Sequence, residues 1–360
     1  MSLSLEQKVG QLFFIGIAGP EFDDATRELL DDVSPGGVCL FARNIRGAAQ
    51  TRKLLDDIRK HSSSDILLSI DQEGGLVDRL RRLVTPMPAA NKMRKAEDAK
   101  RLASLIAETL RMLGFNMDFA PVVDVIDEER AKHPNGLFSR EFGRSKEDVV
   151  NLAGPFLDEM QSGGILGCLK HFPGLGASRV DSHEELPTVE TDETEFENTD
   201  LYPYRELLKN ANAVMVAHAA YPALPLQERD QNGKLLPSSL SNNFISTLLR
   251  GRLGFDGLVI TDDLEMGAII KNYGIGEACK MAVNAGADML AICADPDRIR
   301  EGYRAALNAV KSGEISETRL ETSLARITEV GGKLAEPTPL DTGRLGEISN
   351  DIAAFAAELN

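Results

Sequence analysis

The hydrophobic pattern of the chain alternates short apolar runs with longer amphipathic segments. Each run is only a few residues long and is apolar on both faces, which is typical of a buried parallel strand. The runs cover residues 12–17, 37–41, 66–71, 117–121, 168–172, 213–218, 258–261 and 288–292. This pattern predicts eight strands that lie in one parallel sheet.

The segments between the runs have helical periodicity, most clearly in residues 21–33, 96–114 and 145–164. The third of them has an N-cap candidate at Ser145, acidic residues in its first turn and glycines at its C-terminal end. Eight strands that are each followed by a helix indicate an α/β fold of the (β/α)8 TIM-type barrel. The alternative is a doubly wound open sheet, but its usual glycine-rich phosphate loop is represented only by the weak segment 16–20.

No internal repeat, low-complexity tract or long linker divides the sequence. We therefore expect one barrel domain over residues 1–360. From about residue 295 to the end the pattern is helical, with a proline-containing break at residues 335–341.

Composition and charge narrow the set of partners and compartments. The chain has 360 residues and a formal net charge of −16, which argues against nucleic acid or an anionic membrane as a partner. Its four cysteines are scattered without a C-x-x-C motif, as expected for buried free thiols in a reducing compartment. The N-terminal apolar run lacks a basic flank, and no segment approaches the roughly 20 apolar residues of a membrane span. We expect a cytoplasmic protein.

One segment, residues 168–187, combines chemical groups with residues that break regular structure. Lys170 and His171 come at the end of an apolar run, and Asp181 and His183 follow after two glycines and a proline. The chain has only five histidines. Glycine and proline predict a long loop after a short strand, and loops on a rigid scaffold are common positions for catalytic groups.

A barrel places its active site where the strands end, at the C-terminal face. Polar and charged side chains occur at nearly every predicted strand end or in the loop that follows it. These residues are Asp71, Arg79, Asp118, Asp124, Arg140, Lys170, His171, His218, Asp262 and Asp263. We therefore expect one active site at the mouth of the barrel.

Three chemistries compete for these residues. A metal hydrolase would need histidines at ligand spacing, and the sequence has no H-x-H pair. A Schiff-base aldolase could use the amine of Lys170. A retaining glycosidase needs a carboxylate nucleophile and a proton donor, for which Asp262 and the pair Asp181 and His183 are candidates.

The motifs of the chain resemble those of the bacterial β-N-acetylhexosaminidases of glycoside hydrolase family 3. The resemblance extends over residues 5–290, and the short members of this family are single (β/α)8 barrels. Its motifs are I-D-Q-E-G-G (70–75), D-R-L (78–80), K-H-F-P-G (170–174), D-S-H (181–183) and G-L-V-I-T-D-D-L-E-M-G-A-I (257–269).

The resemblance implies a role for each candidate residue. It implies that Asp262 is the nucleophile and that His183, oriented by Asp181, is the acid/base. It also implies a set of sugar-binding residues, in which Lys170 donates hydrogen bonds and forms no imine. That set is Asp71, Arg79, Arg140, Lys170 and His171. No metal and no organic cofactor are implied.

The sequence departs from the family pattern at four positions. Leu175, Ala177 and Ser178 stand where the family has the last histidine, aspartate and threonine of K-H-F-P-G-H-G-D-T. Leu76 stands where the family has an arginine after E-G-G. The departures leave the catalytic pair intact and concern the sugar preference and the packing of the loop.

The resulting hypothesis is an exo-acting retaining β-N-acetylglucosaminidase whose substrate is a small carbohydrate with a terminal β-linked amino sugar, derived from cell-wall muropeptides. The absence of tryptophan and the aromatic content of 5% favour a small pocket over a long polysaccharide groove. The alternatives are a phosphorylase acting on the same glycosides and a β-glycosidase with another sugar preference. A non-catalytic sugar-binding barrel and a Schiff-base lyase acting through Lys170 also remain open.

Overall fold

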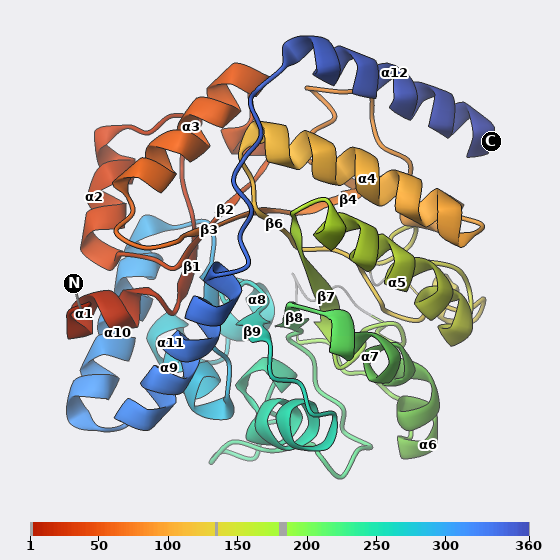
Figure 1. Ribbon diagram of the computed structural model, residues 1–360. Coiled ribbons are helices and arrows are strands. Elements are labelled where there is room, and N and C mark those ends of the chain that lie inside the picture. The colour runs from red at the N-terminus through yellow and green to blue at the C-terminus, as the bar shows by residue number, and fades with distance from the viewer. Residues whose placement is uncertain (1–2, 134–135, 180–185, 360) are drawn as a thin grey trace.

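The computed structural model describes residues 3–133, 136–179 and 186–359, and its strands form a ring at the centre of the molecule (Figure 1). All eight predicted strands are present, and seven of them lie within the predicted apolar runs. The other, β7, begins two residues earlier than its run. Their bounds are β1 Phe13–Gly16, β2 Gly37–Leu40, β3 Leu67–Ile70, β6 Met117–Asp118, β7 Leu166–Phe172, β8 Ala213–Val216, β9 Leu258–Thr261 and β10 Leu290–Ile292.

The strands form one parallel sheet in the order β10-β1-β2-β3-β6-β7-β8-β9. A parallel bridge between Ile260 and Met289 joins β9 to the residue that precedes β10. Three hydrogen bonds support this junction, including Asp288 N to Val259 O at 2.8 Å and Thr261 N to Met289 O at 3.0 Å. The ring therefore returns on itself, and the predicted (β/α)8 barrel is confirmed.

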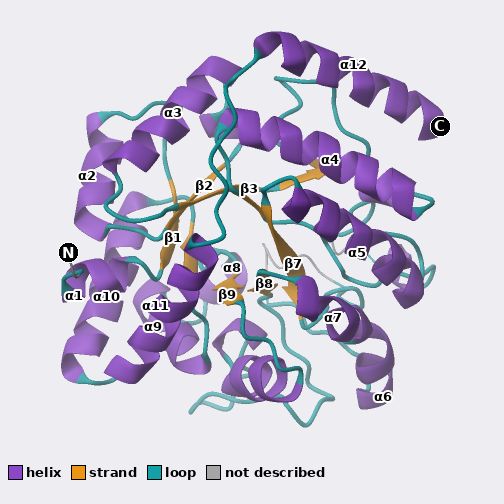
Figure 2. Cartoon of the chain, viewed as in Figure 1, coloured by secondary structure: helices purple, strands orange, loops and turns teal. Residues whose placement is uncertain are grey.

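Helices surround this ring, as the colouring by secondary structure makes plain (Figure 2). At the start of α5 the Ser145 side chain accepts a hydrogen bond from Asp148 N, which confirms the predicted N-cap. The helices are α1 Leu5–Gly10, α2 Asp24–Val33, α3 Ala48–His61, α4 Ala96–Leu113, α5 Lys146–Ser162, α6 Glu193–Glu195, α7 Tyr202–Leu207, α8 Gly267–Ile270, α9 Ile275–Ala285, α10 Pro296–Ser312, α11 Glu317–Gly331 and α12 Thr342–Leu359, and a π-helix covers Asn243–Arg252.

A small hairpin follows β3, and the apolar pattern did not predict it. Its strands are β4 Gln72–Gly74 and β5 Val77–Asp78. Gly74 and Gly75 have φ values of 87° and 59°, in the left-handed region that favours glycine. A Cβ atom on Gly74 would also lie 2.2 Å from Pro88 O. The two glycines of the D-Q-E-G-G motif therefore serve the turn of this hairpin.

The C-terminal part of the chain is helical from α10 onward, as the sequence predicted. The last helix, α12, crosses the outside of α4 rather than the barrel itself (Figure 1). Ion pairs join the two helices, with Arg344 Nε 2.7 Å from Glu108 Oε1 and Arg101 Nη1 2.7 Å from Glu358 Oε2. The helix α12 therefore adds an outer layer on one side of the barrel.

All four cysteines are buried and free, as predicted. Across residues 3–133, 136–179 and 186–359, no helix combines the length and the apolar character that a membrane crossing requires.

A buried carboxylate holds α11 to the barrel. Asp288 precedes β10 and accepts hydrogen bonds from Arg319 Nη2 at 2.9 Å, Ser323 Oγ at 3.0 Å and Val259 N at 3.1 Å. Arg250 and Arg326 contact the same carboxylate. One side chain thus joins β9, α11 and the helix before β9, and its negative charge compensates three guanidinium groups.

Substituting Asp288 with asparagine should destabilise the protein by about 3 kcal/mol, because the change leaves partly buried guanidinium groups without a counter-charge. Asp256 offers a matched control, since it is exposed and lies 4.0 Å from Arg326. Asp256→Asn should cost less than about 1 kcal/mol. Urea unfolding of both variants measures the difference, and equal losses would contradict the structural role of Asp288.

Candidate active site

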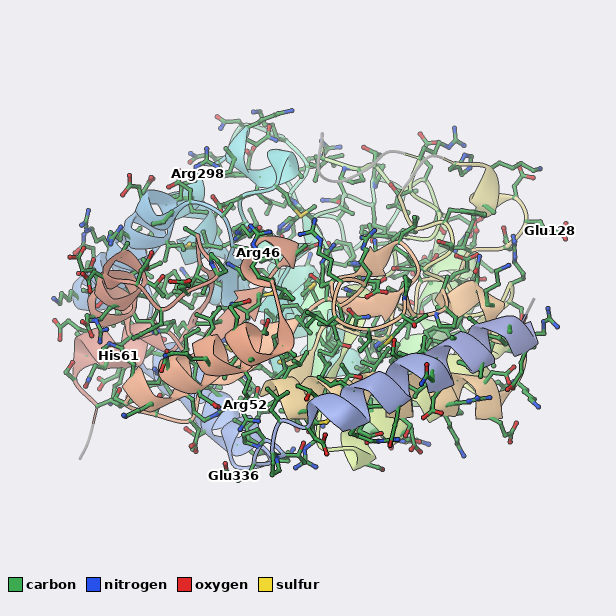
Figure 3. All side chains as sticks on the ribbon, turned by 90° about the horizontal axis from the view of Figure 1, so that it is seen from above. Arg46, Arg52, His61, Glu128, Arg298 and Glu336 are labelled. Carbon is green, nitrogen blue, oxygen red and sulfur yellow. The ribbon has the colours of Figure 1, made fainter. Side chains whose placement is uncertain are left out.

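A cavity of about 250 Å³ opens at the C-terminal ends of the strands. Figure 3 views the barrel from the side, with Arg298, which follows β10, near the upper edge and Glu336 at the lower edge. The residues predicted to act as nucleophile or to bind the sugar, where they lie within the described part of the chain, all line this cavity. They are Asp71, Arg79, Arg140, Lys170, His171 and Asp262.

Lys170 is the most buried charged group of the cavity, with 1% of its surface exposed. Its Nζ lies 2.7 Å from Asp71 Oδ1 and 2.6 Å from Glu73 Oε1. Burial disfavours the ammonium form, but the two carboxylates outweigh burial and raise the pKa of Lys170 above its ordinary value. A permanently protonated amine is a poor nucleophile, so this environment argues against a Schiff base on Lys170.

Glu73, in β4, connects Lys170 to Arg140. Arg140 Nε lies 2.8 Å from Glu73 Oε2, and Arg140 Nη2 lies 2.9 Å from Glu73 Oε1, which makes the pair bidentate. Burial alone would raise the pKa of Glu73, but Lys170 and Arg140 lower it well below its usual range. Glu73 belongs to the D-Q-E-G-G motif, but the sequence alone did not predict a role for it.

His171 is oriented by Asp124, which comes from the loop after β6. His171 Nδ1 lies 2.7 Å from Asp124 Oδ2, and Arg140 Nη2 lies 3.4 Å from His171 Nε2. A carboxylate only accepts and a guanidinium only donates, so these contacts suit an imidazole with its proton on Nδ1. Asp124 was recognised as a strand-end residue, and the structure identifies its partner.

Arg79 has a spare hydrogen-bond donor. Its Nη2 is 3.9 Å from Asp71 Oδ2, a loose contact for an ion pair. Its Nε is buried and has no hydrogen-bond partner among the described residues. A buried guanidinium donor without a partner is costly, so the described residues leave Arg79 only partly satisfied.

Asp262 directly follows β9, and the barrel fixes its backbone. Asp262 N donates to Val216 O of β8 at 2.9 Å, and Asp262 Oδ1 accepts from Asp263 N at 2.8 Å. Burial opposes ionisation, yet the nearby imidazoles of His218 and His171 lower the pKa of Asp262 below its ordinary value. Asp262 is therefore a carboxylate at neutral pH.

The pKa of the neighbouring Asp263 is shifted in the opposite direction. Burial raises the pKa of Asp263 to about 7, and the charges of Glu265 and Asp262 add to the rise. Asp263 Oδ1 accepts from Glu265 N at 3.0 Å, which starts the turn after β9. Of the two adjacent carboxyl groups, Asp262 is the one that is ionised over the whole neutral range.

Two other strand-end residues do not line the cavity but contact the segments around it. His218 Nδ1 lies 2.7 Å from Ser239 Oγ, and His218 Nε2 lies 3.0 Å from Asp263 O. Asp118 Oδ1 accepts from Gln72 N at 2.9 Å, and burial raises the pKa of Asp118 well above its usual range. Both residues contact backbone atoms of segments that carry site residues.

The predicted acid/base pair, Asp181 and His183, lies outside the described residues. Among the positions that depart from the family pattern, Leu175 is buried in the cavity wall, and its backbone N donates to Asp124 Oδ1 at 2.6 Å. Any residue type except proline could make this backbone contact. Leu76, by contrast, projects into solvent with 65% of its surface exposed.

Within residues 3–133, 136–179 and 186–359, no group of three or more His, Cys, Asp or Glu side chains is arranged to hold a metal ion. The carboxylates of Asp71, Glu73 and Asp124 instead contact lysine, arginine and histidine side chains, respectively.

Comparison with known proteins agrees with the sequence motifs and the geometry. The family model for the glycosyl hydrolase family 3 N terminal domain matches residues 4–330. A β-hexosaminidase of Tolumonas auensis is 36% identical over 286 residues, which cover 78% of this chain and 81% of that protein. A β-hexosaminidase of Pseudomonas aeruginosa is 34% identical over 288 residues, or 78% of this chain and 82% of that one.

Solved structures give the same assignment. The glycoside hydrolase family 3 β-N-acetylglucosaminidase from Paenibacillus sp. has a TM-score of 0.88 and 36% identity, over 98% of this chain and 69% of that one. The β-N-acetylhexosaminidase from Beutenbergia cavernae has a TM-score of 0.83 and 28% identity, over 92% and 99% of the two chains. The protein is therefore a glycoside hydrolase that belongs to glycosyl hydrolase family 3.

Proposed function

We propose that this protein is an exo-acting retaining β-N-acetylglucosaminidase that removes terminal β-linked N-acetylglucosamine. The observation that carries the proposal is the position of Asp262, an ionised carboxylate in the same small cavity as the charged cluster around Lys170. The name of the Paenibacillus sp. relative supports N-acetylglucosamine as the sugar, and that of the Tolumonas auensis relative supports a hexosaminide substrate.

The charged cluster is suited to bind the hydroxyl groups of one sugar. Asp71 accepts hydrogen bonds, while Arg79, Arg140 and Lys170 donate them, and charge-assisted hydrogen bonds are roughly twice as strong as neutral ones. Most of these groups are already held by ion pairs, so a sugar would meet donors and acceptors that need little rearrangement. The cavity of about 250 Å³ favours a single terminal residue over an extended chain.

The reaction proceeds in two steps. In the first, the Asp262 carboxylate attacks the anomeric carbon, the glycosidic C–O bond breaks, and the leaving oxygen takes a proton from His183. In the second, His183 removes a proton from water, and the resulting oxygen attacks the anomeric carbon and releases Asp262. Asp181, two residues before His183, would hold the imidazole by accepting a hydrogen bond from its Nδ1–H.

We also propose cell-wall muropeptides as the source of the substrate and the cytoplasm as its location. The first part rests on the resemblance to the bacterial β-N-acetylhexosaminidases. The four buried free cysteines support the second part, because free thiols persist in a reducing compartment.

A panel of aryl β-glycosides that share 4-nitrophenol and differ only at position 2 of the sugar tests the proposed activity. The 2-acetamido sugar should have a kcat/KM at least about 100-fold above that of the 2-hydroxyl sugar, because a site built for a polar substituent discriminates strongly against its absence. Asp262→Asn serves as the control for contaminating activity. Preference for the 2-hydroxyl sugar would indicate a different β-glycosidase, and no turnover would indicate a non-catalytic sugar-binding barrel.

The acid/base role of His183 makes a second prediction. His183→Ala should change the first step little for 2,4-dinitrophenyl glycosides, whose leaving group needs no proton. For a disaccharide substrate the same variant should lose about 100-fold or more in rate, since the alcohol must be protonated as it leaves.

His61 offers a matched control, because it pairs with Asp31 at 2.7 Å and does not line the cavity. The His61→Ala variant should hydrolyse both substrates at the wild-type rate. If His183→Ala lowers the rate equally across leaving groups of different acidity, His183 donates no proton.

A further inference from the structure

Asp124 is a buried carboxylate that does not line the cavity but contacts a residue that does. Its exposed fraction is 1%, and its partner His171 lines the cavity. The backbone after β6 runs beside β7, where Val123 N donates to Lys170 O at 2.8 Å and Lys170 N donates to Pro121 O at 3.2 Å. These backbone hydrogen bonds hold Asp124 next to His171.

Both oxygen atoms of the Asp124 carboxylate accept hydrogen bonds. Oδ2 lies 2.7 Å from His171 Nδ1 and accepts from His171 N at 3.3 Å. Oδ1 accepts from Leu175 N at 2.6 Å. Rotating the carboxylate would break at least one of these contacts in a buried site, which costs free energy. The imidazole of His171 therefore meets an acceptor in a fixed position.

This acceptor decides which ring nitrogen of His171 carries the proton. A carboxylate only accepts hydrogen bonds, so Nδ1 donates, and a neutral imidazole then has its lone pair on Nε2. Arg140 Nη2 lies 3.4 Å from Nε2, which is long for a hydrogen bond, and lies 2.9 Å from Glu73 Oε1. Arg140 lines the cavity and Asp124 does not, so the Nε2 end of the ring is the end nearer to the cavity.

The other predicted sugar-binding residues supply more donors than acceptors. Arg79, Arg140 and Lys170 only donate hydrogen bonds. Asp71 accepts them, but its Oδ1 is already 2.7 Å from Lys170 Nζ. Each hydroxyl group of a sugar has a proton to donate as well as lone pairs that accept. A lone pair on His171 Nε2 would accept one of these protons.

We infer that Asp124 is a positioning residue for sugar binding, which holds the proton of His171 on Nδ1 and so makes Nε2 an acceptor for a sugar hydroxyl group. This inference rests on the proposed function and adds one hydrogen bond to it. Asp124 itself does not touch the sugar and acts through His171. The competing explanation is a purely structural role, in which Asp124 only secures the backbone at Leu175.

The tautomer of His171 can be measured without a substrate, from the ¹⁵N NMR signals of the imidazole nitrogens. The chain has five histidines, and the signals absent from His171→Ala identify this one. We expect a protonated Nδ1 and an unprotonated Nε2 in the wild-type protein. A wild-type ring that is protonated on Nε2 would overturn the inference, whether or not any variant folds.

Asp124→Asn should reverse the tautomer. The amide oxygen of asparagine can accept from Leu175 N, and its NH2 group then faces His171 Nδ1 and moves the ring proton to Nε2. Nε2 would then present a donor to Arg140 and to the sugar. A ring that keeps its proton on Nδ1 in Asp124→Asn would show that Asp124 does not control the tautomer.

A double-mutant cycle tests whether Asp124 acts through His171. The readout is kcat/KM for 2,4-dinitrophenyl β-N-acetylglucosaminide, whose leaving group needs no proton. Asp124→Asn and His171→Ala should each lower kcat/KM by about 10- to 100-fold, as expected when a hydrogen bond of a buried site is lost. Combined with His171→Ala, Asp124→Asn should cost less than about threefold more, because the ring that it positions is already absent. Losses that multiply would overturn the inference in favour of the structural role.

Asp31→Asn is a matched control. Asp31 Oδ1 lies 2.7 Å from His61 Nε2, in a second Asp–His pair that does not line the cavity. This variant should keep the wild-type kcat/KM.

The outcomes separate the two proposals. No turnover by the wild-type protein would overturn the proposed function, and the NMR measurement, which needs no turnover, would still decide whether Asp124 sets the tautomer. Turnover with losses that multiply would leave the proposed function intact and overturn the role of Asp124.

Discussion

The active site depends on one buried cation, the ammonium of Lys170 between the carboxylates of Asp71 and Glu73. Removing a single charged group from water costs free energy, and this applies to the ammonium and to both carboxylates. The three groups therefore stabilise one another in their ionised forms. They come from β7, the end of β3 and the hairpin that follows it. Through Arg140, Glu73 extends the network to the turn that Arg140 N closes by donating to Leu137 O at 3.0 Å. These ion pairs thus fix the positions of the hairpin after β3 and of the turn that contains Arg140.

This network also explains why the cavity suits carbohydrate chemistry. Its side chains are held by ion pairs before a sugar arrives, and preorganised charges cost little reorganisation during a reaction. Arg79, which also lines the cavity, makes only a loose contact with Asp71, at 3.9 Å between Nη2 and Oδ2. Asp262 and Asp263 are adjacent in sequence, but their environments move the pKa values of their carboxyl groups in opposite directions. Asp262, which directly follows β9, is therefore the one of the two that is an anion throughout the neutral pH range.

The fold was predictable because each strand is a short apolar run, and a strand-end rule then located the candidate residues at one mouth. Contacts between loops were not predictable. Glu73 and Asp124 acquire their roles only through Arg140 and His171, which are distant in sequence. Alternation along a strand would also place Lys170 and His171 on opposite faces, whereas both line the cavity, in a stretch of β7 where the register with β8 shifts. Exposure of Leu76 depends on the hairpin turn, which has no apolar signature.

We propose that the anomeric carbon of a sugar in this cavity reacts with the Asp262 carboxylate. Incubation with a 5-fluoro N-acetylglucosaminyl fluoride, which keeps the 2-acetamido group and slows release of the covalent intermediate, tests the claim by mass spectrometry. We predict one adduct per chain, located by peptide mapping on Asp262 and absent from Asp262→Asn, while Asp263→Asn still accumulates it. An adduct on Asp263 or any other residue, or turnover of the reagent without an adduct, would contradict the account.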